Sequence, residues 1–179
     1  MEPTSPTTRE LLGAVDAAWR PFRAAAMSLP TGRMEDATAA GWTYKVMLAH
    51  VAAWHELTAR RLEAYREKGR VEPPAGRAAL RTFEELGFAH ADVEGLMREW
   101  HFDKFNAAVK AAATERAGPD VLRSLDASFA HVREAIAALT DAESTAHVTD
   151  GKSFVYAIVE GNTFAHYDEH AAELGLAPR

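Results

Sequence analysis

Two histidines near the end of the chain have a spacing that can bind a metal ion. His166 and His170 are four positions apart, so a helix would set them about 40° apart around its axis and about 6 Å apart along it. Both imidazoles could then reach one ion. The chain has eight histidines, so such a pair can also arise by chance, and a pair of surface or helix-capping histidines is the alternative interpretation.

A third nitrogen donor could come from His50. This residue lies among apolar residues at helical spacing, where an unpaired polar ring would cost free energy. Two roles would satisfy it: a core histidine bonded to a backbone carbonyl, or a metal ligand. Three neutral imidazoles leave positions open for water or substrate, as in catalytic sites, and they suit Zn, Ni or Fe(II) better than Mg or Ca.

Three further side chains could take part in chemistry at such a site. Glu173 returns to the face of His166 and His170 and could orient a ligating ring or act as a base, although an exposed acid of the last turn is the alternative. Tyr167 flanks His166 and is the other candidate catalytic residue. Trp54 lies one turn beyond His50 and could form a pocket wall that contacts a cofactor, although core packing is the ordinary role of a large aromatic side chain.

The other histidines are weaker candidates for metal ligands. His55 follows His50 by five positions, about 140° around a helix, so we expect it to point elsewhere and to be solvated. The remaining four have no partner at a useful spacing: His90, His101, His131 and His147.

The elements that must position these side chains are helices. The sequence is rich in alanine and nearly lacks the alternation of β-branched residues that is typical of strands, which predicts an all-α protein. Thr7 and Glu10 have capping-box spacing and predict the start of a first helix. Pro21 should kink that helix or end its first segment, and residues 30–32 should stop it.

The later helices follow from the same kinds of signal. Thr43 and Gly69 bound a second helix over about 43–68, and weaker helical patterns cover 77–86 and 90–116. Pro119 begins a long amphipathic helix. After a polar loop over 140–152, Ser153 caps a final helix that runs to Gly175. We expect one domain, 1–179, built as a four-helix bundle with antiparallel neighbours and additional short helices in the middle segment.

Composition narrows the function. The chain has 179 residues and a net charge of −6, which disfavours nucleic acid and anionic membranes as partners and leaves a small-molecule substrate. No stretch is apolar for long enough to cross a membrane, no apolar signal region opens the chain, and cysteine is absent, so we expect a cytoplasmic protein. Any thiol chemistry would need a thiol from outside the chain.

Two segments also carry a family resemblance. Trp42 to Trp54, with the sequence WTYKVMLAHVAAW, and Asn162 to His170, with the sequence NTFAHYDEH, resemble the DinB/YfiT-like superfamily. The chain is most similar to its ClbS/DfsB-type branch, including Phe105-Asn106 and the helix from Val121 to Leu139. The resemblance implies a four-helix bundle, often a homodimer, in which His50, His166 and His170 bind a divalent metal.

The resemblance also implies a range of activities. The superfamily includes thiol-dependent transferases and isomerases that use mycothiol or bacillithiol, and the ClbS-type branch includes a self-resistance hydrolase. We therefore expect a metalloenzyme in which the ion, zinc before nickel or iron, activates a thiol or water against an electrophilic small molecule. The alternatives are a non-catalytic protein that sequesters a small molecule for self-resistance, and a metal-free helical interaction module.

Overall fold

The computed structural model describes residues 5–69, 102–146, 148–149 and 152–177, and within them the protein is mostly helical, as predicted. The α-helices are α1 (Thr8–Ser28), α2 (Tyr44–Lys68), α5 (Phe102–Thr114), α6 (Gly118–Ala137), α7 (Asp141–Thr145), α8 (Phe154–Asn162) and α9 (Phe164–Ala171). Short 3-10 helices cover Thr31–Arg33 and Ala172–Leu174. Strands β1 (Val148–Thr149) and β2 (Lys152–Ser153) pair antiparallel. The helix predicted over 77–86, and the part of the 90–116 segment before residue 102, lie outside the described residues.

The first two helices begin, and α2 ends, where their local signals predict. The backbone N–H of Glu10 donates to Thr7 Oγ1 at 3.3 Å, and the Thr7 N–H donates to the Glu10 carboxylate at 2.8 Å. Thr43 Oγ1 accepts from the N–H of Val46 at 3.2 Å and caps α2. Gly69 ends α2 with a φ of 62°, a left-handed conformation that glycine adopts without a steric penalty. These ends need only bonds between near neighbours in the sequence.

Of the two outcomes predicted at Pro21, the end of the first helical segment is wrong, because α1 continues through Pro21 to Ser28 as one element. A proline inside a helix removes one hydrogen bond and costs about 3 kcal/mol. Pro21 itself is exposed, whereas Trp19, Phe22 and Ala26 around it are buried against the rest of the protein. Burial of these side chains offsets the lost hydrogen bond.

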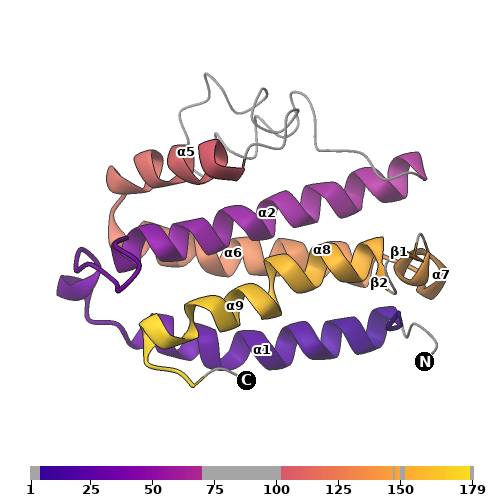
Figure 1. The fold of residues 1–179 in the computed structure, drawn as a ribbon, viewed down its shortest axis with the longest axis horizontal. Helices are drawn as coiled ribbons and strands as arrows, with labels where there is room; N and C mark the ends of the chain where they lie inside the picture. The colour runs from indigo at the N-terminus through magenta and orange to yellow at the C-terminus, as the bar shows by residue number, and fades with distance from the viewer. Residues whose placement is uncertain (1–4, 70–101, 147, 150–151, 178–179) are drawn as a thin grey trace.

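The long helices α1, α2 and α6 run alongside one another and alongside the α8–α9 segment, and α5 lies against α2 (Figure 1). The start of α2 lies near the chain that enters α6, since Lys45 Nζ donates to the carbonyl of Thr114 at 3.0 Å. Its other end lies near α7, where the Tyr65 hydroxyl donates to the carbonyl of Glu143 at 3.3 Å. Helices α2 and α6 therefore run in the same direction. The expected antiparallel arrangement is wrong for this pair, because α5 makes the return crossing between them.

The last quarter of the chain has more elements than the sequence predicts. The expected polar loop over 140–152 contains α7 and the strand pair, and α7 has a capping box of its own between Thr140 and Glu143. Ser153 caps the next helix as predicted, accepting from the N–H of Tyr156 at 3.1 Å. The single final helix is wrong: Thr163, with φ −128° and ψ −98°, separates α8 from α9. Its hydroxyl donates to the carbonyl of Val159, a contact that often bends helices.

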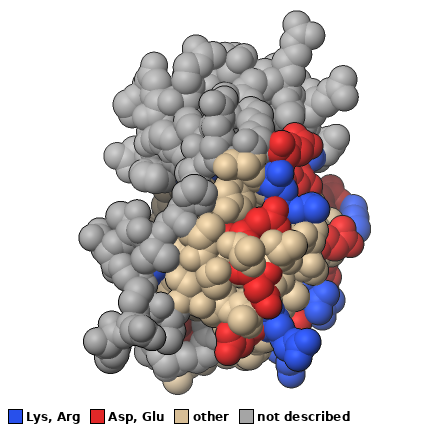
Figure 2. All heavy atoms as spheres, turned by 90° about the vertical axis from the view of Figure 1, so that its right-hand side faces the viewer, with Lys and Arg blue, Asp and Glu red and all other residues tan. Residues whose placement is uncertain are grey.

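The core lies between α1, α2, α6 and α9 and is rich in aromatic rings. Trp19 stacks on Phe129 with ring centres 4.1 Å apart, and Phe22 stacks on Tyr167 at 4.9 Å. Outside the core, acidic and basic side chains are interspersed over the described part of the face in Figure 2, so neither sign of charge dominates it. Among the described residues, no helix is both long enough and apolar enough to cross a membrane.

Candidate metal centre

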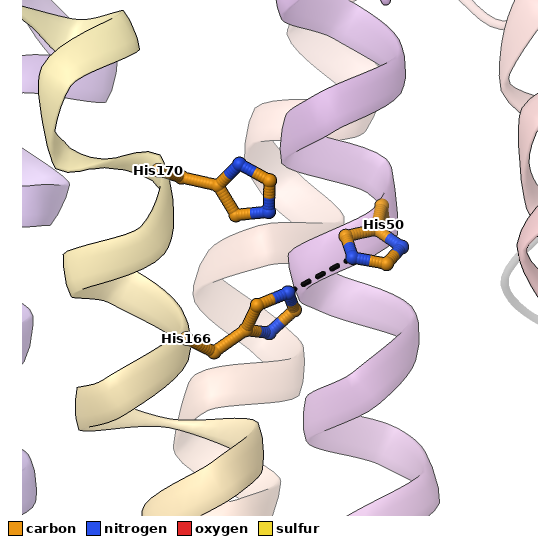
Figure 3. A group of neighbouring side chains, drawn as sticks. All are labelled: His50, His166 and His170. Atoms are coloured by element: carbon orange, nitrogen blue, oxygen red, sulfur yellow. Dashed lines mark hydrogen bonds between the residues drawn. The ribbon is translucent and has the colours of Figure 1, made fainter. Parts of the chain in front are cut away.

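The structure brings His50, His166 and His170 together from α2 and α9, with their rings facing one another (Figure 3). His50 Nε2 lies 2.9 Å from His166 Nε2, and one ring nitrogen from each of the three histidines lies within 4.8 Å of the other two. His50 and His166 are each only 6% exposed, and His170 is partly buried. Among the described residues, these three histidines form the cluster whose possible ligand atoms lie close enough together to hold a metal ion.

The break at Thr163 matters because it gives α9 an axis separate from that of α8 (Figure 1). Asn162 Nδ2 donates to Thr58 Oγ1 on α2 at 2.9 Å, which ties the break to that helix. Beyond the break, the four-residue spacing of His166 and His170 puts both rings on the side of α9 that faces His50. Local spacing thus pairs two donors, and packing of α9 near α2 adds the third.

Burial keeps two of these rings neutral. It lowers the pKa of His50 to about 3, with the nearby His170 lowering it further and Asn106 opposing the shift. Burial also holds the pKa of His166 well below its ordinary value, and His50 and His170 add to this effect. At neutral pH both rings are therefore uncharged, which is the form that binds metals.

Glu173 orients the third ring. Its Oε2 lies 2.8 Å from His170 Nδ1, and the Glu173 side chain is only 9% exposed. Although burial raises the pKa of Glu173, Thr38, His170 and the Ala40 backbone lower it below its ordinary value overall. The ionised carboxylate therefore accepts from Nδ1–H of His170 and holds the ring with Nε2 toward the cluster (Figure 3). The expectation that Glu173 could orient a ring matches this geometry, and the alternative of an exposed last-turn acid does not.

Aromatic rings surround the three histidines. Trp42 lies edge-on to His50 with ring centres 4.8 Å apart, and Trp54 lies 6.2 Å from His50 and 6.4 Å from His166. Trp54 Nε1 donates to Asn106 Oδ1 on α5 at 3.3 Å. Trp54 thus adjoins the cluster and is itself buried. Sequence reasoning did not assign Trp42 or Asn106 to the site, although Trp42 begins the first of the two segments that carry the family resemblance and the Phe105-Asn106 pair is a further part of it.

Tyr167 and His55 lie on the other side of α9 and α2 from the cluster. The Tyr167 hydroxyl is 2.7 Å from His55 Nε2, and His55 is completely buried. The expectation that His55 points away from His50 agrees with this, but the expectation that it is solvated is wrong. Its position in the helix faces a core that α1, α6 and α9 complete. Tyr167, a candidate catalytic residue, directs its hydroxyl to His55 and not to the three histidines.

His131 also has partners that its sequence spacing does not reveal. Its two ring nitrogens lie 2.7 Å from Glu56 and 2.8 Å from Glu63, both on α2. These contacts join α6 to α2 across a separation of about 70 residues, so local spacing could not have predicted them. His90, His101 and His147 lie outside the described residues.

The donor set fits a transition-metal ion. A tetrahedral zinc ion, with Zn–N distances of about 2.0–2.1 Å, needs ligand nitrogens roughly 3.3 Å apart. The separations here range from 2.9 Å to no more than 4.8 Å, so small ring rotations would meet that requirement. His50 Nδ1 and His166 Nδ1 are buried with no hydrogen-bond partner among the described residues, so no outer contact on Nδ1 orients these two rings.

Comparison of the chain with protein-family models, with curated proteins and with solved structures gives no match. The class of the protein therefore follows from the molecule itself. It is a mostly helical protein with three converging histidines that could hold a metal ion.

Proposed function

We propose that the protein is a metalloenzyme of the DinB/YfiT-like type, a four-helix bundle in which His50, His166 and His170 hold a divalent ion. Zinc is the first candidate, with nickel and iron next, because the donors are three imidazoles. The observation that carries the proposal is the convergence of three rings from α2 and α9, with two nitrogens at 2.9 Å although their residues are 116 positions apart. Isolated core histidines do not require such convergence.

The reaction we propose is attack by an activated thiol or water on an electrophilic small molecule. A bound zinc ion lowers the pKa of a thiol or water and so supplies a nucleophile near neutral pH. Because the chain has no cysteine, the thiol would be an external co-substrate, such as mycothiol or bacillithiol. His50, His166 and His170 would hold the ion, and with three protein donors a position would remain for the thiol.

In this proposal, residues of the chain bind the ion and orient its ligands. His50 and His166 offer uncharged nitrogens at neutral pH because burial disfavours their protonation. Glu173 contacts His170 on the ring nitrogen remote from the cluster, so it positions this ligand and does not act as a base on substrate. Trp42 and Trp54 keep water away from the rings, which strengthens the electrostatic interactions there.

The first experiment is elemental analysis of tag-free protein, purified without added metal and again after reconstitution with zinc. The wild type is compared with the double variant His166→Ala/His170→Ala and with His131→Gln, a control that changes a histidine outside the cluster. We expect near-stoichiometric metal in the wild type and in the control, and none in the double variant.

The second experiment tests the reaction. Zinc-loaded protein is mixed with a low-molecular-weight thiol and an epoxide, and consumption of both is followed over many turnovers. We expect the double variant to be inactive. Wild type that holds no metal after reconstitution would refute the metal site, whereas stoichiometric binding of the electrophile without turnover would identify a sequestering protein.

A further inference from the structure

A chain of three buried polar side chains crosses the core beside the histidine cluster. The Tyr167 hydroxyl lies 2.7 Å from His55 Nε2, His55 Nδ1 lies 3.2 Å from Ser128 Oγ, and Ser128 Oγ donates to the carbonyl of Leu125 at 3.0 Å. All three side chains are no more than 2% exposed. This Tyr167–His55–Ser128 chain joins α9, α2 and α6, and the proposed reaction does not use any of its members.

The direction of each hydrogen bond is determined by the last one. Because the Ser128 hydroxyl proton points to the Leu125 carbonyl, Ser128 Oγ accepts from His55 Nδ1–H. His55 Nε2 then has a lone pair and accepts the Tyr167 hydroxyl proton. Each of the three side chains has a hydrogen-bond partner in this arrangement, and a placement of α9 that broke the Tyr167 contact would deprive His55 Nε2 of its donor in an apolar core.

The same two helices carry the histidine cluster. Helix α2 provides His50 and His55, five positions apart, and α9 provides His166 and Tyr167, which are adjacent. The helix pair is thus joined by His50 and His166 on one side and by His55 and Tyr167 on the other. Rotation or sliding of α9 that broke the second contact would also move His166 and His170 away from His50.

We propose that the Tyr167–His55–Ser128 chain is the positioning device of the metal centre, setting the rotation and depth of α9 against α2. This inference rests on the proposed function, since it concerns the geometry of the ion's ligands. Helix α9 has only eight residues, and a helix of that length has no stable position without tertiary contacts. Its stacking contact, Tyr167 on Phe22, is less directional than a hydrogen bond, so the hydroxyl supplies the angular constraint.

The test measures metal affinity in the full-length protein. The variants are Tyr167→Phe, which keeps the stacked ring and removes the hydroxyl, and Ser128→Ala, which removes the acceptor of His55. The control is Ile136→Val, which removes one buried methyl group near the end of α6. This position lies beside the end of α2 that is remote from His50. The substitution should cost about as much stability as the loss of one hydrogen bond. Zinc affinity is measured by competition with a chromogenic chelator, and the visible spectrum of cobalt-loaded protein reports ligand geometry.

We expect Tyr167→Phe to weaken zinc binding about tenfold and to change the cobalt spectrum, because a small displacement of α9 misplaces two of the three ligands. Ser128→Ala should change the zinc affinity and the cobalt spectrum in the same direction but by less. If Tyr167→Phe does not fold, Ser128→Ala is used in its place. Ile136→Val should keep the wild-type affinity and spectrum. The inference is overturned if Tyr167→Phe matches the wild type in both measurements, or if Ile136→Val weakens binding equally. Wild type that binds neither metal would overturn the proposed function itself.

Discussion

Replacing His131 with glutamine should flatten the pH dependence of stability between pH 6.5 and about 9. His131 on α6 donates from both ring nitrogens to Glu56 and Glu63 on α2, at 2.7 and 2.8 Å. A ring that donates twice is a charged imidazolium. The hydrogen bond to Glu56, opposed by partial burial and aided by Glu63, raises the pKa of His131 from 6.5 to about 9.

The sign and size of the effect follow from this shift. Between pH 6.5 and 9 the folded protein binds more protons than the unfolded chain, so its stability falls as pH rises. The contribution is fully present below pH 6.5 and is lost as pH passes through about 9. At 1.36 kcal/mol per pKa unit its ceiling is roughly 3 kcal/mol. Because the Glu63 side chain is 37% exposed, solvent screening reduces the expected value to about 1–2 kcal/mol.

Urea unfolding at pH values below 6.5, between 6.5 and 9, and above 9 would measure this contribution. The wild type should lose about 1–2 kcal/mol more than His131→Gln across the series. Glu56→Gln should remove more of the pH dependence than Glu63→Gln, because Glu56 makes the larger contribution. Parallel curves for the wild type and His131→Gln, or the reverse order of the two glutamate variants, would refute the reasoning.

Three further predictions concern the metal centre and a helix end. Zinc at 100 times its dissociation constant should stabilise the wild type by about 2.7 kcal/mol, or roughly 5–10 °C in Tm, and leave His166→Ala/His170→Ala unchanged in a thermal scan. Glu173→Ala should weaken zinc binding about 10- to 100-fold, because His170 Nδ1 loses its acceptor; unchanged affinity in chelator competition would contradict the proposed orienting role. Thr140→Ala should lower the free energy of unfolding by about 1 kcal/mol, because α7 loses its N-terminal cap, and urea unfolding would measure this loss. The variant should keep the metal content of the wild type in elemental analysis.

Much of the secondary structure could be predicted because its signals are local. The cap of α1 at Thr7, the cap of α2 at Thr43 and the left-handed end at Gly69 involve bonds between residues three or four positions apart. Such bonds form from the sequence of one segment and do not depend on what packs against it. The facing of His166 and His170 is predictable for the same reason, since helical periodicity alone sets it.

Predictions failed where a distant segment decides the outcome. Helix α1 continues through Pro21 because neighbouring side chains are buried. The expected final helix is instead divided at Thr163, next to Asn162, which bonds to Thr58 of α2. Helices α2 and α6 run in the same direction because α5, whose boundaries the sequence marks weakly, crosses between them. Propensity and capping contribute about 1 kcal/mol at each position, and burial of several side chains outweighs them.

The sequence by itself determined that the protein is helical, where its capped helices begin and which two histidines share a face. Only the tertiary structure decided which side of α2 meets α9, and therefore that His50 joins those two histidines while His55 lies buried against Tyr167. The physical reason is that helical periodicity fixes the angle between residues on one helix, whereas the angle between two helices depends on side chains more than 100 positions apart in the chain.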